Sequence, residues 1–271
     1  MSIKLGIIGG GVMAEAILSR FIQQQISAPG TILVSDRSSN RLDFLSQTYQ
    51  VQVTNQNQQV IEGTEVVLLA IKPQVLNTVL TELSLDTPLN PKPLIISILA
   101  GVTLERLEAG FPDYPVIRAM PNTPATVGHG ITAITPGKQV TTQQVTQGRL
   151  LLNAIGKVVE VPENLMDAVT GLSGSGPAYV ALMIEALSDG GVAAGLPRAI
   201  ASELALQTVL GTAKLLETQG LHPAELKDRV TSPGGTTIAG VAELEKAAFR
   251  SALIEAVKAA AARSLALGKR E

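Results

Sequence analysis

The sequence predicts an α/β protein in which a doubly wound, parallel sheet is followed by an all-helical region. Short apolar strands alternate with amphipathic helices over residues 1–162, and a glycine-rich turn follows the first strand directly. Strand patterns are missing from residues 163–271. An alternation of strand and helix favours a parallel sheet covered by helices. We therefore expect two domains, 1–162 and 163–271.

The expected strands of the first domain are short and rich in branched apolar residues. They cover residues 3–8, 31–35, 65–71, 94–98, 116–119 and 157–161. The stretch EVVLLAI at 65–71 is continuously apolar, which is typical of a strand buried on both faces. Helices are expected over 9–24 and 38–45, and Ser38, Ser39 and Asn40 are candidate N-caps of the second.

The second domain shows helical spacing only. We expect helices at 178–192, 197–218, 223–230, 236–249 and 250–267. Pro197, Pro223 and Pro233 are expected in first helical turns. Residues 199–216 have apolar or small side chains on more than one face, and 256–267 is rich in alanine. Helices this apolar need partners, so we expect this domain to form a homodimer.

The composition excludes several classes of site and partner. Of 271 residues, 45% are hydrophobic and 16% charged, and the net charge is −2. Without cysteine there are no disulfides or thiolate ligands, and two distant histidines argue against a metal centre. The charges form no basic block, so neither nucleic acid nor an anionic membrane is an expected partner. We see no signal peptide or membrane-spanning run and expect a cytoplasmic protein.

The glycine turn has the pattern G-x-G-x-x-A between a strand and a helix. Gly9 permits the tight turn, Gly11 admits a pyrophosphate, and Ala14 allows close packing of helix on strand. The helix start would then offer free N–H groups to the phosphates. This context predicts a Rossmann-type domain for NAD(P), although a glycine turn without a ligand is the alternative. The assigned cofactor residues are Gly9, Gly10, Gly11, Val12, Met13 and Ala14.

The second strand ends in Asp36-Arg37-Ser38, which carries two conflicting signals for the cofactor. An acidic residue here is typical of binding to the ribose 2′-hydroxyl of NAD, whereas arginine favours the 2′-phosphate of NADP. Asp36 would repel that phosphate unless it turned aside to cap the next helix. We expect NADPH, with NADH as the alternative, and an exposed charge is the alternative interpretation of Arg37.

Other strand ends should line the same groove, because ligands of open α/β sheets bind at the carboxyl edge. We assign cofactor contacts to Ala70, Lys72 and Ala100, although an ordinary turn remains an alternative for Ala100. Residues 120–123, which follow the strand at 116–119, should overhang the nicotinamide.

Six stretches together resemble the pyrroline-5-carboxylate reductase family. They are GIIGGGVMAEAI, VVLLAIKPQ, RAMPNTPATVGHG, DAVTGLSGSGPAYV, DGGVAAGLPR and SPGGTTIAG. The resemblance implies reduction of 1-pyrroline-5-carboxylate to L-proline by NAD(P)H, the last step of proline biosynthesis. It also implies a Rossmann domain, a helical dimerisation domain, and dimers that often assemble into larger rings.

The resemblance also implies site residues. Asn57 joins the cofactor contacts, and Glu163 is a substrate contact. The substrate carboxylate falls on Ser232, Gly234, Gly235, Thr236 and Thr237. Some members have serine at Asp36, which leaves the cofactor preference open, and some have asparagine at Arg229, which we do not carry over. A glycine-cushioned N-cap and a boundary charge are the alternatives for the 232–237 turn and for Glu163.

This chemistry explains why the 232–237 turn has no acid or base. The substrate is a cyclic imine whose nitrogen is partly protonated near neutral pH, and an iminium carbon accepts hydride readily. The enzyme therefore needs mainly positioning. Free N–H groups after Pro233 would hold the carboxylate. We assign the catalytic role to Thr237, which would hydrogen-bond the ring nitrogen or the carboxylate.

Three other functions are alternatives for this sequence. A β-hydroxyacid dehydrogenase needs a catalytic lysine one turn after the glycines of the second domain, where Val180 stands. A non-catalytic NAD(P) sensor would have no use for a second anion pocket. A reductase of a related cyclic imine stays open.

Overall fold

A computed structural model describes residues 4–85 and 89–268, and the chain divides into two compact units. The first comprises the residues up to Gly174 together with those from Ala260, and the second comprises Ser175–Ala259. The last helix contributes to both units. The boundary predicted at 162/163 was drawn from sequence pattern and stays a prediction.

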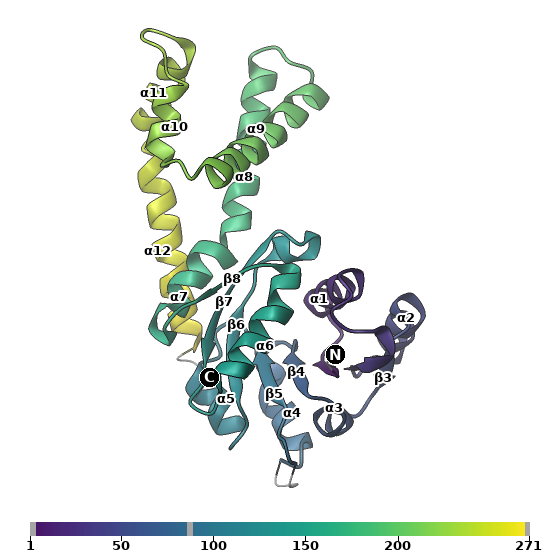
Figure 1. Cartoon of the computed structure of the whole chain (residues 1–271). Coiled ribbons are helices and arrows are strands. Elements are labelled where there is room, and N and C mark those ends of the chain that lie inside the picture. Colours follow the sequence, from purple (N-terminus) through teal and green to yellow (C-terminus); the bar gives the residue numbers. More distant parts are fainter. Residues whose placement is uncertain (1–3, 86–88, 269–271) are drawn as a thin grey trace. The chain divides into compact units, whose positions relative to one another are not determined.

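The first unit contains an eight-stranded sheet among the described residues (Figure 1). Its strands are β1 (Leu5–Ile8), β2 (Ile32–Ser35), β3 (Gln52–Thr54), β4 (Val66–Leu69), β5 (Leu94–Ser97), β6 (Val116–Met120), β7 (Gly130–Pro136) and β8 (Gly156–Glu160). Their order is β3-β2-β1-β4-β5-β6-β7-β8, and all neighbours are parallel except β6 and β7. The predicted α/β fold class is confirmed, but β3 and β7 were not anticipated from the sequence.

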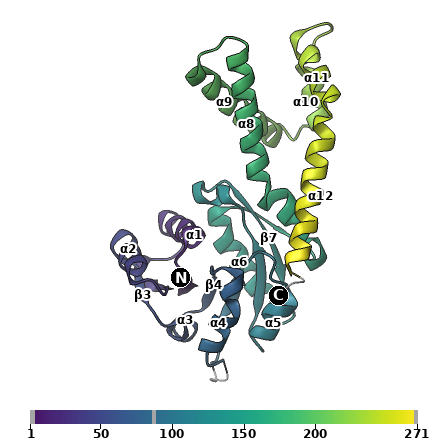
Figure 2. The ribbon, with the colours of Figure 1, turned by 180° about the vertical axis from the view of Figure 1, so that it is seen from behind.

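Helices of the first unit lie on both faces of the sheet (Figure 2). They are α1 (Val12–Gln23), α2 (Ser39–Tyr49), α3 (Asn57–Gly63), α4 (Leu76–Glu82), α5 (Leu104–Gly110), α6 (Thr142–Leu152) and α7 (Met166–Val169). Short turns are η1 (Pro29–Thr31), η2 (Pro73–Val75), η3 (Thr123–Val127), η4 (Asn153–Ile155), η5 (Glu163–Leu165) and the π-helical η6 (Thr170–Gly174).

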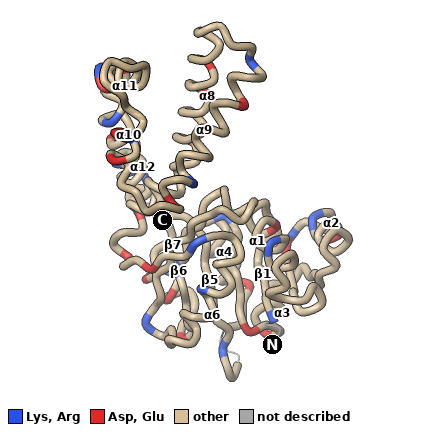
Figure 3. The backbone as a smooth tube through the Cα atoms, turned by 45° about the horizontal axis from the view of Figure 1, so that its top comes forward, with Lys and Arg blue, Asp and Glu red and all other residues tan. Residues whose placement is uncertain are grey.

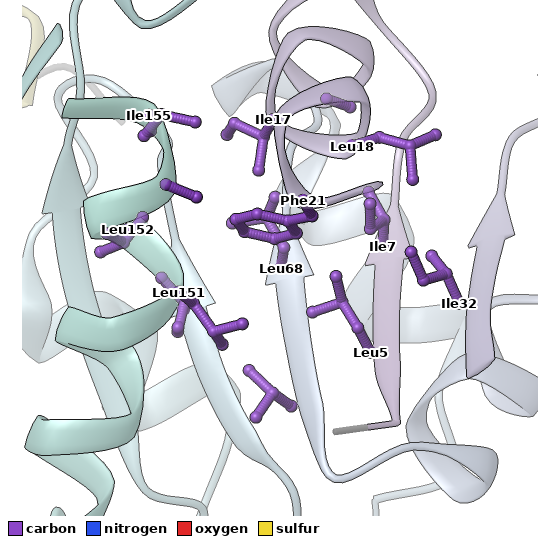
Figure 4. Close-up of a cluster of buried hydrophobic side chains, with 14 of the residues drawn as sticks. Leu5, Ile7, Ile17, Leu18, Phe21, Ile32, Leu68, Leu151, Leu152 and Ile155 are labelled. Atoms are coloured by element: carbon purple, nitrogen blue, oxygen red, sulfur yellow. The ribbon is translucent and has the colours of Figure 1, made fainter. Parts of the chain in front are cut away.

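Two hydrophobic clusters cover the two faces of the sheet, because successive strand residues point to opposite sides. Leu5 and Ile7 of β1 pack with Phe21 of α1 and Leu151 of α6 in one cluster (Figure 4). Ile8, the next residue of β1, belongs to the other cluster, which includes residues of α4 and α5. The central strands are therefore buried on both faces, as their apolar runs predict.

The second unit is helical throughout, with α8 (Gly176–Ala193), α9 (Arg198–Gln219), α10 (Pro223–Arg229), α11 (Thr236–Lys246) and the first part of α12 (Phe249–Gly268). Pro223 is the first residue of α10, as predicted, but Pro197 is the N-cap of α9 and Pro233 lies in the turn before α11. Proline suits these extended and turn positions because it fixes φ.

Many large apolar side chains of the second unit are exposed in the single chain. Leu182, Leu206 and Leu210 are more than half exposed. Acidic and basic residues are distributed over both units (Figure 3). The exposed leucines of the second unit require a partner surface. Among the helices described, none is long and apolar enough to cross a bilayer.

Candidate active site

The glycine turn joins β1 to α1 at the carboxyl edge of the sheet. Gly9 has a φ of +97°, and a Cβ there would lie 2.8 Å from the carbonyl oxygen of Ala70, so only glycine fits. Gly11 is different, because a Cβ there would meet no atom within 4 Å. Helix α1 has no side-chain cap, and within the described residues the amides of Val12 and Met13 donate to no protein acceptor, so they are available to an anion.

A cleft of about 350 Å³ opens beside this turn. Seven of the predicted cofactor residues line it, namely Gly9, Gly11, Asp36, Arg37, Asn57, Ala70 and Lys72. The other six, Gly10, Val12, Met13, Ala14, Ser38 and Ala100, are outside its lining. Of these, Ala14 is buried in the core and Ala100 is exposed after β5. The structure therefore gathers about half of the predicted set at one sheet edge.

The carboxylate of Asp36 is turned toward the protein backbone. One of its oxygens accepts a hydrogen bond from the amide of Gly10 at 2.8 Å, and the other accepts from the amide of Ser38 at 2.9 Å. The side chain of Ser38, not that of Asp36, caps α2 by accepting from the amide of Arg41. Asp36 therefore turns toward the glycine turn and does not cap a helix through its side chain.

Two cationic side chains of the cleft are unpaired within residues 4–85 and 89–268. Neither the guanidinium of Arg37 nor the ammonium of Lys72 forms a hydrogen bond or ion pair there, and both residues are exposed. Free cations on a cleft wall fit an anionic ligand, because no internal carboxylate has to be displaced.

The predicted residue Asn57 lines the cleft together with two polar residues that the sequence does not predict, Thr78 and Glu82. The side-chain oxygen of Asn57 accepts from the hydroxyl of Ser35 at 2.7 Å, and its nitrogen donates to Glu82 at 2.9 Å. Thr78 and Glu82 of α4 line the cleft beside Asn57. The sequence offers no local signal for Glu82, because its position depends on how α4 packs beside β4.

Glu163 and Arg118 form an ion pair at the carboxyl edge of β6. The Arg118 side chain, 5% exposed, donates to Glu163 at 2.5 Å, and the amide of Leu104 donates to the same oxygen at 2.9 Å. The other Glu163 oxygen is buried and has no partner among the described residues. The pair joins β6, the start of α5 and η5. As a substrate contact, Glu163 stays a prediction.

Met120 ends β6 and packs against the π-helical turn η6. A Cβ at Gly174 would lie 2.9 Å from the Cε of Met120, so glycine allows this close approach. The hydroxyl of Ser173 donates to the carbonyl of Val169 at 3.0 Å within the same turn. The π-helix, a feature frequent at functional sites, has no local signal in the sequence.

The turn predicted to hold the substrate carboxylate lies in the second unit. Gly235 is the N-cap of α11, and no side chain caps this helix. In the described part of the chain, the amides of Thr236 and Thr237 donate to no protein acceptor. Gly234 has a φ of +67°, and the amide of Gly235 donates to the carbonyl of Ser232 at 3.1 Å. Thr237 is half-buried and Thr236 is exposed. The arrangement leaves a helix start open to an anion.

The described residues contain no cluster of three or more histidine, aspartate or glutamate side chains suited to a metal ion. They do contain two helix starts whose first amides donate to no protein acceptor. The start of α1 follows the glycine turn of the cleft that Arg37 and Lys72 line, and the start of α11 carries the hydroxyls of Thr236 and Thr237. Such groups bind and orient anions.

Comparison with known proteins gives consistent matches. Residues 4–101 match the family model described as NADP oxidoreductase coenzyme F420-dependent, and residues 163–267 match pyrroline-5-carboxylate reductase dimerisation. A pyrroline-5-carboxylate reductase from Synechocystis sp. is 63% identical and covers 100% of both chains.

Solved structures agree with these sequence matches. A pyrroline-5-carboxylate reductase from Coxiella burnetii has a TM-score of 0.92 at 35% identity and covers 98% of this chain and 99% of its own. A Plasmodium falciparum pyrroline carboxylate reductase with NADP bound has a TM-score of 0.85 at 31% identity, with 98% of each chain covered.

Proposed function

The chain belongs to the pyrroline-5-carboxylate reductase family, and we infer that it reduces 1-pyrroline-5-carboxylate to L-proline with hydride from a nicotinamide cofactor. This is the last step of proline biosynthesis. The observation that carries the conclusion is 63% identity to a relative of that name over the whole of both chains. The residues that bind and orient the cofactor and the substrate are proposed from the contacts seen in this chain.

We propose NADPH as the preferred cofactor. The guanidinium of Arg37 is unpaired in the described residues and lines the cleft, so it is available to a 2′-phosphate. The carboxylate of Asp36 already accepts two backbone amides, which partly neutralise its charge and hold it away from that phosphate. The structure of the Plasmodium falciparum relative has NADP bound, which supports the same choice.

The pyrophosphate is proposed to lie on the open amides at the start of α1. Gly11 leaves room for it, and Lys72 lines the same cleft. Asn57 would then meet a ribose hydroxyl through one of the two atoms that now bind Ser35 and Glu82. Gly10, Val12, Met13, Ala14, Ser38 and Ala100 stay proposed as members of the site, acting through backbone or packing.

The substrate carboxylate is proposed to bind the turn formed by Ser232, Gly234, Gly235, Thr236 and Thr237. Two open amides and the positive end of the α11 dipole stabilise a carboxylate, and glycines keep the approach clear. Glu163 stays proposed as a substrate contact: Arg118 and Leu104 occupy one of its carboxylate oxygens, and the other has no partner among the described residues.

The chemical step needs little acid–base help from the protein. A nicotinamide held by the cleft would supply a hydride to the imine carbon. With the ring nitrogen already protonated, the C=N π pair would return to nitrogen and a neutral amine would result, so no proton donor is needed at that step. Thr237 is proposed as the catalytic residue that orients the ring through its hydroxyl, and positioning supplies most of the rate.

The second unit supports a proposal for the assembly of the protein, and the reaction supports one for its location. The dimerisation match and the exposed leucines support a homodimer, and we propose that dimers associate into larger rings. We also propose a cytoplasmic location, where NADPH is available, and a division of labour between residues 1–162 for cofactor and 163–271 for dimerisation and substrate.

The test is the oxidation of NADPH, followed by absorbance, with and without 1-pyrroline-5-carboxylate. Thr237→Val should raise the substrate KM or lower kcat by about tenfold, since one hydrogen bond to a charged ligand is lost. Thr218→Val, at an exposed site of α9, is the matched control and should leave both unchanged. Tight NADPH binding without turnover would favour a sensor, and turnover only with a six-membered imine would favour the related reductase.

A further inference from the structure

Gly10 is the one residue of the glycine turn that side chains hold at both backbone polar groups. Its amide donates to Asp36 at 2.8 Å, and its carbonyl accepts from the Nε of Arg41 at 2.5 Å. Among the described residues, the hydrogen bonds of the flanking glycines are to backbone: the Gly9 amide donates to the Ser35 carbonyl, and the Gly11 carbonyl accepts from the Glu15 amide. The orientation of the Gly10–Gly11 peptide therefore depends on a side chain of α2.

Arg41 contacts three groups: the Gly10 carbonyl, the Glu15 carboxylate and the Phe44 ring. One terminal nitrogen of its guanidinium forms an ion pair with Glu15 of α1, and its Cζ atom lies over the Phe44 ring, 5.0 Å from the ring centroid. Glu15 also accepts a hydrogen bond from the hydroxyl of Tyr49 at 2.8 Å. The Arg41 and Glu15 side chains are about one-quarter exposed, at 26% and 27%. Arg41 thus bridges α2, α1 and the turn.

This bridge separates Arg41 from its neighbour Arg37. Arg37 lines the cleft and has no protein partner within the described residues, whereas Arg41 is absent from the cleft lining and its fork is occupied. A guanidinium whose donors are fixed by a carboxylate and a carbonyl is poorly placed to capture a phosphate. The two arginines of the SDRSSNR stretch have different surroundings, and sequence alone does not distinguish them.

We propose that Arg41 is a positioning residue for the cofactor: it fixes the Gly10 carbonyl and so aims the amides that follow it at the pyrophosphate. This inference rests on the cofactor site proposed above. It has a specific consequence, because the pyrophosphate is common to NADH and NADPH and the 2′-phosphate is not. Loss of Arg41 must weaken both cofactors by the same factor, whereas loss of Arg37 must weaken NADPH alone.

The test measures KM for NADPH and for NADH in four variants of the full-length chain. Arg41→Met should raise both values by about tenfold, as expected when a charged hydrogen bond that fixes the loop is lost. Arg41→Lys should recover part of that loss, and Glu15→Gln should show a smaller rise in both. Arg37→Ala, the matched control, should raise only the KM for NADPH. The circular dichroism spectrum and the oligomeric state of Arg41→Met should match those of the natural chain, which a general folding defect would not allow.

Two outcomes would overturn the inference. A rise confined to NADPH in Arg41→Met would make Arg41 a direct phosphate ligand, and unchanged values for both cofactors would leave the loop independent of it. Gly11→Val distinguishes these from failure of the site, since packing admits a side chain there but a pyrophosphate would not. If Gly11→Val leaves cofactor binding intact, the proposed site is wrong; if it abolishes binding while Arg41→Met has no effect, only the positioning role is lost.

Discussion

Removal of the Glu163 carboxylate should destabilise the first unit because of the charge that it leaves behind. The Arg118 side chain is 5% exposed and Glu163 is its ion-pair partner in the described structure, while Leu104 donates its amide to the same oxygen. Breaking a buried ion pair by removing one partner costs about 3–5 kcal/mol. Because the Glu163 side chain is 34% exposed, water screens part of this, and we expect a loss of about 2–3 kcal/mol for Glu163→Ala.

The assay is urea unfolding at neutral pH together with steady-state kinetics. Arg118→Met/Glu163→Met removes both charges and should recover most of the lost stability, to within about 1 kcal/mol of the natural chain, since apolar replacement of a buried pair is often neutral. The kinetic result tests the role of Glu163. If Glu163→Ala changes the unfolding free energy by less than about 0.5 kcal/mol, the stabilising role of the ion pair is refuted. A strong rise in the substrate KM would support the predicted substrate contact, and an unchanged KM would contradict it.

Three further changes test other parts of the structure. Gly9→Ala should cost about 1–3 kcal/mol, because φ is +97° and the methyl group would meet the Ala70 carbonyl, and it should raise the cofactor KM, whereas Gly30→Ala, which meets no atom, should do neither. Burial raises the pKa of the Glu15 carboxyl, but hydrogen bonds from Arg41 and Tyr49 and the charge of Arg41 outweigh it and hold that pKa below its ordinary value of 4.5. The natural chain should therefore have a larger free energy of unfolding than Glu15→Gln in chemical denaturation. This difference should be constant above pH 4.5 and should decline as the pH falls through the lowered pKa of Glu15; a difference that grows on acidification would contradict this. Tyr114→Phe should leave the free energy of unfolding unchanged or raise it, because the Tyr114 hydroxyl is buried without a partner in the described residues. A loss above about 1 kcal/mol would indicate that the hydroxyl has a partner.

The sequence predicts those elements whose signal is local. The apolar runs of β1, β4, β5 and β6 and the helices α8 to α12 are found within a few residues of their expected ends. The strand β3 (Gln52–Thr54) was missed because it is short and polar, and β7 because its antiparallel pairing with β6 is a tertiary choice. A strand of three residues at a sheet edge has too little apolar pattern to be recognised.

The site shows the same division between local and tertiary signals. The glycine turn is recognisable because Gly9 and Gly11 have distinct backbone roles. Arg41 and Glu82 were not predicted, because their contacts with Gly10 and Asn57 arise only when α2 and α4 pack beside the sheet. The Glu163–Arg118 pair is 45 residues apart in sequence, and no local pattern announces it.

We propose that the carboxylate of the substrate binds the open start of α11 while the cofactor lies on the glycine turn. A crystal structure with L-proline and NADP⁺ tests it most directly. We predict the proline carboxylate within hydrogen-bond distance of the Thr236 and Thr237 amides, and the pyrophosphate at the start of α1. Proline bound away from residues 232–237 would contradict the account.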